Sequence, residues 1–445
     1  MQTVESTVKE FSKNALIKLN RALRDNETPS ADALCELQKY RLSHKELAKE
    51  VFDILVEQAK LINEKAICAF RIKRLDSIIR KVKRLEGSIE LKSMGDIAGC
   101  RCILDSDNEV YQLMRMLKNH PKLVINEEGV NNYIKYPKKS GYKSIHMYVT
   151  IDGYGKRKVE IQLRSKVHHD WATFVEVLDT VYKINVKEGL MGKPLSTYTD
   201  FCLFHKILSK KDEHLDTEEV KTILSLIAKH DILQEVSMLM IRNVANVRKQ
   251  WADMLSQCPY IPKNFYISTN DKKEPTIQAF ESYTQSEEYY YLQFEQNSTT
   301  NQVLVCIDSA SFDSISRAYS NYILVCHEFA HRLHRIMAKA MKNPSFDITF
   351  LRKFIIYYKK RILQLVQHLH IEKEELSRAK YDDDIMNEWF SDLENSLERF
   401  DDDSRLLSMA SNRFMVNNAK GLEKVVAWWY YIKGWMQHVL HIGRL

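Results

Sequence analysis

Polar and apolar side chains alternate in two short segments, KSIHMYV (143–149) and KVEIQLR (158–164). Because successive side chains of a strand point to opposite faces, each segment would turn its apolar residues to a core and its polar residues to the other face. If both strands lie in one sheet, a carboxylate, an imidazole and a guanidinium share that polar face. The residues expected on it are His146, Tyr148, Glu160, Gln162 and Arg164.

Further charged residues lie close to these strands in the sequence. In MGDIAGCRCIL (94–104), Asp96 and Arg101 flank Gly99, a residue that would let a ligand approach the backbone. The basic turn PKKSG (137–141) leads into the first polar strand. Carboxylates can hold magnesium, and Lys and Arg can neutralise polyphosphate, so the combination favours phosphoryl-type transfer. A polar sheet face whose groups only satisfy one another is the alternative.

The elements that would position these residues follow from changes of pattern along the chain. Helical spacing of Leu, Ala and Ile runs to about residue 60, and the basic segment 71–92 is typical of a helix with one apolar stripe. Strand patterns follow in GCRCIL (99–104), NNYIKY (131–136), KSIHMYV and KVEIQLR, and the chain then becomes helical to about residue 258. The later expectations are a linker, PYIPKNFYISTNDKKEP (259–275), two strands, YYYLQF (289–294) and QVLVCID (302–308), a helix from SFDSISRAY (311–319), and helices beyond.

Composition narrows the class of protein. The chain has 445 residues, a length that indicates more than one domain. Its residues are 44% hydrophobic and 28% charged, which is typical of a folded globular protein. Its net charge of +7 permits an anionic partner without requiring nucleic acid. Eight scattered cysteines without a C-x-x-C pair fit a reducing, cytoplasmic location. No membrane contact is expected, because the apolar tail 425–442 is interrupted by Lys433 and Gly434; a buried or partner-facing helix is expected there.

Four motifs occur in a fixed order: RIKRLDSIIRKVKR (71–84), DIAGCR (96–101), YIKYPKKSGYKSIH (133–146) and VEIQLR (159–164). Together they resemble the synthetase domain of the RelA/SpoT-type (p)ppGpp synthetases. The resemblance implies a Mg²⁺-dependent transfer of pyrophosphate from ATP to the ribose 3′-hydroxyl of GDP or GTP. It also implies a fold of the α/β (α+β) class, with a mixed sheet flanked by helices.

Carried over by position, the resemblance implies three groups of site residues. The catalytic group would be Asp96, Glu160 and Arg101, with Asp96 and Glu160 as the metal-binding carboxylates and Glu160 as the base. The ATP phosphates would be bound by Arg71, Lys73, Ser77, Lys81 and Arg84, all expected in one helix. Tyr142 would stack on the acceptor base. The other acceptor-binding residues would be Lys135, Lys138, Lys143, His146, Gln162 and Arg164.

The resemblance covers one part of a chain with five predicted parts. These are a helical N-terminal extension (1–60), the synthetase domain (61–185), a helical segment (186–262), a small α/β accessory module (263–345) and a helical C-terminal region (346–445). No hydrolase domain is recognisable in residues 1–60. The segment WATFVEVLD (171–179) has Val175 where many small synthetases have Glu, so that end of the site is expected to differ from theirs.

Several alternatives stay open. Toxin-type relatives place pyrophosphate on the 3′-CCA end of tRNA, and the motifs do not separate the two acceptors. HEFAH (327–331) fits the zinc-peptidase pattern H-E-x-x-H, with Glu388 available as a third ligand. The segment 308–329 also resembles an accessory module of longer RelA/SpoT-like proteins, which favours histidines without a metal. The last alternative is a non-catalytic sensor or binding module. Under any of these functions, the C-terminal region is expected to bind a protein partner or to regulate the synthetase domain of the same chain.

Overall fold

The structure is a computed structural model. It describes residues 11–440 except 27, 85–89, 139, 185–194, 211, 271–272, 297–300, 309–310, 324–328, 344–345, 348, 352, 359, 362–363, 365–366, 368–408 and 410–411. The chain divides into two compact units. Unit 1 comprises residues 1–138, 142–169 and 253–323, and unit 2 comprises residues 139–141, 170–252 and 324–445.

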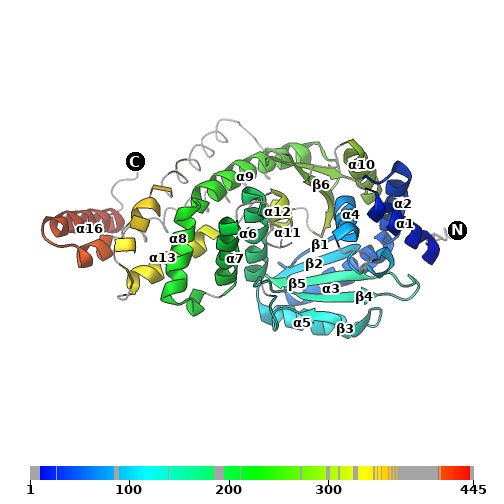
Figure 1. Ribbon diagram of the computed structural model, residues 1–445, viewed down its shortest axis with the longest axis horizontal. Helices are drawn as coiled ribbons and strands as arrows, with labels where there is room; N and C mark the ends of the chain where they lie inside the picture. The colour runs from blue at the N-terminus through cyan, green and yellow to red at the C-terminus, as the bar shows by residue number, and fades with distance from the viewer. Residues whose placement is uncertain are drawn as a thin grey trace. The chain divides into compact units, whose positions relative to one another are not determined.

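Unit 1 is built on one mixed sheet of eight strands in the order β3-β4-β5-β2-β1-β8-β6-β7. Figure 1 labels β1 to β6. The β2–β5 pair is parallel, and the other pairs are antiparallel. The strands are β1 (Ile67–Ile72), β2 (Ala98–Leu104), β3 (Val124–Asn132), β4 (Ile145–Thr150), β5 (Val159–Ser165), β6 (Asn264–Thr269), β7 (Pro275–Phe280) and β8 (Asn301–Ile307). This mixed α+β architecture confirms the fold class predicted from the sequence.

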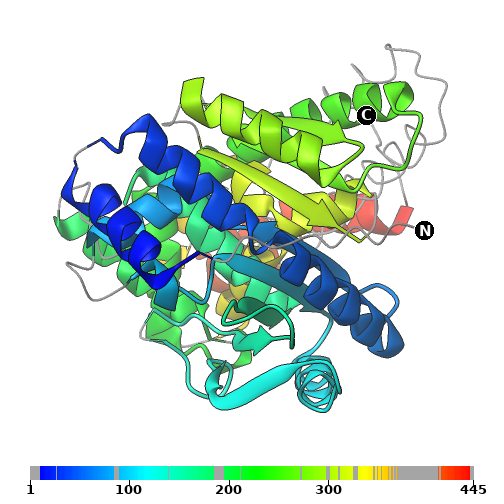
Figure 2. The same ribbon diagram turned by 90° about the vertical axis from the view of Figure 1, so that its right-hand side faces the viewer.

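Helices cover the sheet of unit 1. Helix α3 packs on β1 and β2, α5 packs on β5, and α10 packs on β8, β6 and β7, as Figure 2 shows for α10 in yellow-green. The apolar residues of β4 and β5 join Val51 and Leu55 of α3 and Leu113 of α5 in one core. The helices of this unit are α1 (Lys13–Asp25), α2 (Ala31–Leu42), α3 (Lys45–Ile62), α4 (Leu75–Arg84), α5 (Asp107–Lys118), α10 (Tyr283–Gln296), α11 (Phe312–Ala318) and α12 (Ser320–Ile323).

Local sequence explains where several of these helices begin. The hydroxyls of Ser12, Ser30 and Ser106 accept hydrogen bonds from backbone N–H groups in the first turns of α1, α2 and α5. Each serine thereby satisfies an N–H group that has no partner within the helix. The apolar stripe of the basic helix α4 is also as expected, because Leu75, Ile78 and Val82 are buried.

The structure corrects three secondary-structure predictions. YYYLQF (289–294) lies in helix α10 and not in a strand, because Tyr283, Tyr290 and Phe294 repeat at helical spacing and are buried together on one face. The predicted linker 259–275 contains strand β6, which pairs with β7 and β8. The predicted strand NNYIKY (131–136) extends only to Asn132.

The predicted domain boundaries near residues 60 and 262 run through unit 1. Helices α1 to α3 contribute to its core, and β8 pairs with β1, so the predicted accessory module continues the sheet of the predicted synthetase domain. The backbone hydrogen bonds between β1 and β8 join segments more than 200 residues apart in the sequence. A change of composition marks a segment boundary but carries no information on such pairing, so the sequence could not show it.

The described residues of unit 2 form helices and connecting turns, without a strand. Its helices are α6 (Lys166–Tyr182, which begins in unit 1), α7 (Leu195–Leu208), α8 (Thr217–Lys229), α9 (Ile232–Gln257, which ends in unit 1), α13 (Phe329–Lys342) and α16 (Leu422–Leu440). On α16, Trp428, Trp429 and Trp435 are 47%, 58% and 49% exposed, so they do not pack in a core of their own unit. Among the described helices, none has the length and apolarity needed to cross a membrane.

Candidate active site

Two rows of residues cross the centre of the unit 1 sheet. In one row, Gly99 of β2 pairs with Arg71 of β1 and with Glu160 of β5, and Glu160 pairs with Tyr148 of β4. In the next, Arg101 of β2 pairs with Gln162, which pairs with His146. Paired residues of neighbouring strands point to the same face. The expectation that β4 and β5 share a polar face is confirmed.

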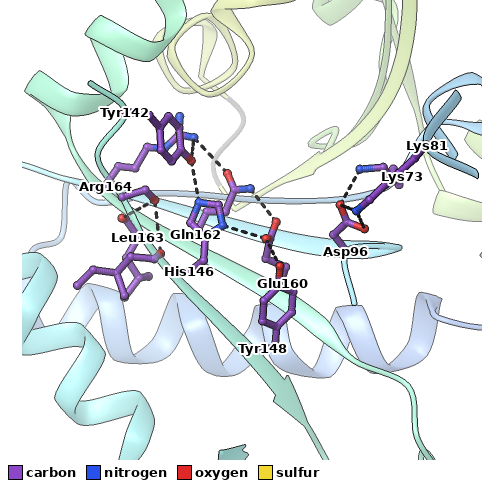
Figure 3. A network of polar contacts seen from close by, with 12 residues as sticks. Lys73, Lys81, Asp96, Tyr142, His146, Tyr148, Glu160, Gln162, Leu163 and Arg164 are labelled. Atoms are coloured by element: carbon purple, nitrogen blue, oxygen red, sulfur yellow. Dashed lines mark hydrogen bonds and ion pairs between the residues drawn. The ribbon is translucent and has the colours of Figure 1, made fainter. Parts of the chain in front are cut away.

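Glu160 is held by three hydrogen-bond donors. Its Oε1 accepts from His146 Nδ1 and from the Tyr148 hydroxyl, each at 2.9 Å, and its Oε2 accepts from Gln162 Nε2 at 2.8 Å (Figure 3). Burial alone would raise the pKa of Glu160, but the hydrogen bond from His146 and the other donors lower this pKa well below its ordinary value. Glu160 is therefore ionised at neutral pH, and His146 carries its proton on Nδ1.

His146 links this carboxylate to Tyr142. The His146 Nε2 and the Tyr142 hydroxyl are 2.7 Å apart, and Arg164 donates to the same hydroxyl. Burial would lower the pKa of His146, but the hydrogen bond with Glu160 and the charge around it raise the pKa overall. A chain of polar contacts thus runs from Arg164 through Tyr142 and His146 to Glu160, as Figure 3 shows.

The Tyr142 ring is enclosed by protein groups. It is 9% exposed and contacts the Tyr133 and His146 rings edge-on. The Arg164 Cζ and Lys138 Nζ atoms lie 4.8 and 5.1 Å from its centroid. An acceptor base could stack on Tyr142 only if one of these cations moved, and the stacking role stays a prediction.

Asp96 forms a second charged cluster with two lysines. Lys73 Nζ donates to Asp96 Oδ2 at 2.8 Å, and Lys81 Nζ is 2.9 Å from each Asp96 oxygen. Burial would raise the pKa of Asp96, but Lys73 and Lys81 outweigh it and lower the pKa. The pKa of Lys73 is lowered, because burial and the neighbouring Lys81 and Arg71 together outweigh Asp96. Figure 3 shows this cluster apart from Glu160 and its donors.

The predicted ATP-binding residues come from two elements and not from one helix. Arg71 lies in β1 and Lys73 in the turn that follows, whereas Ser77, Lys81 and Arg84 lie in α4. Strand pairing of residues 67–72 with β2 prevails over the helical spacing that extends back from α4. The Ser77 hydroxyl accepts from Arg74 Nε at 3.1 Å, and the side chain of Arg84 lies outside the described residues.

Residues of α11 and α12 contact two of the predicted donor-binding arginines. Arg101 Nη1 donates to the carbonyl of Ala318 at 2.6 Å, and its Cζ lies 6.0 Å from the Tyr319 centroid. Arg71 Nη1 donates to the Tyr322 hydroxyl at 3.3 Å. Sequence reasoning missed this contact, because more than 200 residues separate the arginines from the segment that they meet.

The predicted acceptor-binding lysines lie near the turn before β4. Lys138 Nζ is 4.5 Å from the Tyr133 centroid, and Lys135 Nζ is 5.2 Å from that of Tyr136. Lys143 is half-buried two residues before the start of β4. These positions put positive charge beside the chain of contacts around Tyr142, and binding of the acceptor phosphates by these lysines stays a prediction.

The zinc alternative falls mostly outside the described residues. His327 and Glu328 are among the residues not described, and so are Glu388 and the side chain of His331. Within the described part of the chain, no group of three or more His, Cys, Asp or Glu residues is arranged to hold a metal ion. HEFAH as a zinc site therefore stays an untested alternative.

Comparison with known proteins identifies the domain that carries both clusters. Residues 70–187 match a family described as "Region found in RelA / SpoT proteins". The GTP pyrophosphokinase YwaC of Bacillus subtilis is 32% identical over 124 residues, which cover 26% of this chain and 57% of that protein. An uncharacterized protein of Mycobacterium tuberculosis is 29% identical over 175 residues, 39% of this chain and 60% of that protein. The chain thus spans little more than half the length of these relatives.

The similarity to solved structures is also confined to part of the chain. The small alarmone synthetase 2 of Bacillus subtilis is 26% identical with a TM-score of 0.30, covering 40% of this chain and 90% of that one. The fold and site define a mixed-sheet domain with an acidic residue in each of two charged clusters. The match of residues 70–187 to the RelA/SpoT region agrees with the family that the four motifs resemble.

Proposed function

We propose that the chain is a pyrophosphokinase that transfers pyrophosphate from ATP to the ribose 3′-hydroxyl of GDP or GTP, producing (p)ppGpp. The observation that carries the proposal is an ionised Glu160 fixed on the same sheet face as Arg71 and Arg101. Two GTP pyrophosphokinases of Bacillus subtilis among the similar proteins support it. The reducing cytoplasm is the proposed location, because the described cysteines are all free thiols.

In this proposal Glu160 is the general base. It accepts the proton of the ribose hydroxyl while the hydroxyl oxygen attacks the β-phosphorus of ATP. The bond between the β-phosphorus and the α,β-bridging oxygen breaks, and AMP leaves with the electron pair. A carboxylate with a strongly lowered pKa is a weak base. Substrate binding must therefore weaken at least one hydrogen bond to Glu160, and His146 is the partner best placed to turn toward the acceptor phosphates.

The basic residues would neutralise the charge of the donor. Lys73 and Lys81 now share Asp96, and phosphate oxygens would compete for the same ammonium groups. Once the lysines turn toward phosphate, Asp96 would be available to a metal ion. Positioning and charge neutralisation provide most of the catalysis in this class of reaction.

Magnesium is the proposed cofactor. Mg²⁺ is commonly bound through one or two carboxylates, with its other ligands from substrate phosphates and water. Asp96 and Glu160 fit that pattern, because each contributes a carboxylate, and the described residues include no three-ligand cluster that would hold a metal alone. When bound, the ion would withdraw charge from the phosphoryl oxygens.

The test is to identify the acceptor with γ-labelled ATP. Purified protein is incubated with the labelled ATP, Mg²⁺ and GDP, GTP or tRNA, and the labelled product is separated. Label on GDP or GTP is expected. Label on tRNA would replace the acceptor with the 3′-CCA end, the alternative that the motifs left open. Binding of ATP without any labelled product would favour a non-catalytic module.

We further propose that the C-terminal part of the chain restrains the synthetase through Ala318, Tyr319 and Tyr322. These residues contact Arg71 and Arg101, two of the arginines proposed to meet the ATP phosphates. In this proposal, the contacts of Arg71 and Arg101 with residues 318–322 must break before the arginines can bind ATP. Residues 318–322 and ATP would therefore compete for the two arginines.

Point variants test this better than truncation. A chain that ends near Pro262 would lose β6, β7 and β8 from the sheet. Tyr322→Phe deletes only the hydroxyl that accepts from Arg71. We expect a rate increase of about fivefold, the equivalent of one hydrogen bond. Tyr289→Phe in α10 is the matched control and should leave the rate unchanged. Equal rates for wild type and Tyr322→Phe would contradict the restraint.

A further inference from the structure

A buried guanidinium lies between the N-terminal helices and the predicted ATP site. Arg41, in the last turn of α2, is fully buried and donates from Nε to the carbonyl oxygen of Lys73 at 2.6 Å. Its Nη1 and Nη2 donate to the two oxygens of Glu287 at 2.6 and 3.1 Å. Gln38 donates to the same carboxylate at 3.2 Å and accepts from Arg41 at 2.9 Å.

A second bond from this cluster reaches the same turn. The Arg41 guanidinium lies 4.7 Å from the ring centroid of Tyr290, which is also fully buried. The Tyr290 hydroxyl accepts from the backbone N–H of Leu75, the first residue of α4, at 3.0 Å. Glu287 and Tyr290 both belong to α10. The cluster therefore holds residues 73 and 75, on the two sides of the junction between β1 and α4.

This junction determines where the predicted ATP-binding groups stand. Lys73 lies in it, and Lys81 projects from α4 toward the same carboxylate of Asp96. On its other side the junction is fixed to the sheet, because the Lys73 N–H donates to the Ile97 carbonyl at 2.7 Å. A rotation of α4 or a shift of residue 73 would separate the two ammonium groups that are proposed to meet the phosphates.

The choice of arginine is informative, because a buried ion pair is not needed to join two helices. Well-packed apolar residues of similar volume often serve as well or better. Only a guanidinium can donate at once to a bidentate carboxylate and, in a third direction, to a carbonyl. The bond to the Lys73 carbonyl is the part of the arrangement that helix packing does not explain.

We propose that Arg41, Glu287 and Tyr290 are positioning residues of the ATP site. They hold the β1–α4 junction so that Lys73 and Lys81 face one phosphate-binding position. The inference rests on the proposed function only in taking ATP as the ligand of these lysines. It does not depend on which acceptor receives the pyrophosphate.

The test separates ATP binding from turnover. Arg41→Lys keeps the positive charge beside Glu287, but its single ammonium group cannot donate to both the Glu287 carboxylate and the Lys73 carbonyl in the geometry of the guanidinium. We expect the Kd of a fluorescent ATP analogue and the KM for ATP to rise about tenfold, because small misplacements of binding groups cost this much or more. The kcat and the KM for the acceptor should stay within about twofold of wild type. Tyr290→Phe, which removes a single neutral hydrogen bond, should raise the Kd by about fivefold at most.

Two further variants keep the result interpretable. Lys45→Ala is the matched control, because Lys45 donates to Thr284 of the same helix α10 at 3.1 Å and lies over the Tyr283 ring. It should leave the Kd for the ATP analogue unchanged. The double variant Arg41→Met, Glu287→Met replaces the ion pair with apolar packing. It should remain folded by circular dichroism and still bind the analogue about tenfold more weakly.

The outcomes divide cleanly. A fall in kcat at constant KM and Kd, as a smaller folded fraction would give, would overturn the inference. Wild-type Kd in the double variant would do the same, because the pair would then serve packing alone. A wild-type chain that binds the analogue without forming product would refute the proposed function, while a weaker Kd in Arg41→Lys would still support positioning. A wild-type chain that does not bind the analogue would refute both.

Discussion

Glu160→Gln is the substitution that most directly tests the proposed chemistry. It replaces the proposed base with an amide of nearly the same volume and removes one negative charge from the site. Loss of a general base typically lowers turnover by about 100-fold or more. A factor of 100 corresponds to about 2.7 kcal/mol in the activation free energy. We therefore expect kcat to fall by at least this factor while the chain stays folded.

The cost in stability follows from the three hydrogen bonds to Glu160. In the Glu160→Gln variant the side-chain carbonyl oxygen can still accept from His146 and Tyr148, but the new amide nitrogen would face the amide nitrogen of Gln162. Rotation of the Gln162 amide relieves that clash, but it turns the amide nitrogen toward Arg164 Nη2, which donates to the Gln162 oxygen at 3.5 Å in the wild type. The remaining loss is the charge of the carboxylate, and we expect the free energy of unfolding to fall by about 1–3 kcal/mol.

The pH dependence of this loss has a definite sign. The raised pKa of His146 contributes stability below its ordinary value of 6.5, and this contribution disappears as pH rises through the folded-state pKa. The lowered pKa of Glu160 contributes stability above its ordinary value of 4.5. The melting temperatures of wild type and Glu160→Gln should therefore differ most between pH 4.5 and 6.5, and the difference should shrink as pH rises through the folded-state pKa of His146.

Three measurements decide the matter. Turnover is followed as labelled product from γ-labelled ATP, unfolding by calorimetry at several pH values, and the His146 pKa by NMR of histidine-labelled protein. Tyr148→Phe is the control, because it removes one donor and keeps the carboxylate; it should lose less than about tenfold in kcat. Near-normal turnover of Glu160→Gln would refute the base assignment. A His146 pKa that does not fall in this variant would refute the ion-pair reasoning.

Three further predictions concern other parts of the chain. Lys81→Met removes one of the two cations beside Asp96, so the pKa of Asp96 should rise toward its ordinary value and the KM for ATP should rise about tenfold in steady-state assays. His205 in α7 is fully buried, and burial lowers its pKa to about 3, so the free energy of unfolding of the wild type should fall by about 1.4 kcal/mol per pH unit below pH 6.5. In calorimetry, the free energy of unfolding of His205→Leu should change less with pH over this range. An equal pH dependence of the two proteins would contradict this account. His327→Ala should leave synthesis unchanged; one tightly bound zinc per chain, lost in this variant by metal analysis, would restore the HEFAH alternative.

The sequence predicted the central part of the site because its signal is local. Alternation in 143–149 and 158–164 depends only on neighbouring residues, and it correctly indicated which side chains share a sheet face. The order of the four motifs likewise identified the synthetase domain. Helix α4 and strand β2 were recognisable for the same reason, since an apolar stripe and a run of strand-forming residues are both local patterns.

Local patterns were misleading where packing against distant residues decided the outcome. Consecutive tyrosines at 289–291 indicate a strand by propensity, yet they lie in α10 because Tyr290 and Phe294 fill the space over β6 and β8. Arg71 continues the helical spacing of α4 backward, yet it lies in β1 because β2 pairs with that segment. In both cases burial against a partner outweighed a propensity difference of about 1 kcal/mol or less.

The sequence by itself therefore determined the kinds of charged residue in this protein, their order and their alternation on two strands. Only the tertiary structure decided which charges meet. Asp96 lies between Lys73 and Lys81, Arg41 reaches the Lys73 carbonyl, and Arg71 meets a tyrosine 251 positions later in the chain. Such contacts depend on the pairing of β1 with β8 and the packing of α10, which join segments that no local pattern connects. Coulomb and hydrogen-bond energies act over a few ångströms of space, whatever the separation along the chain.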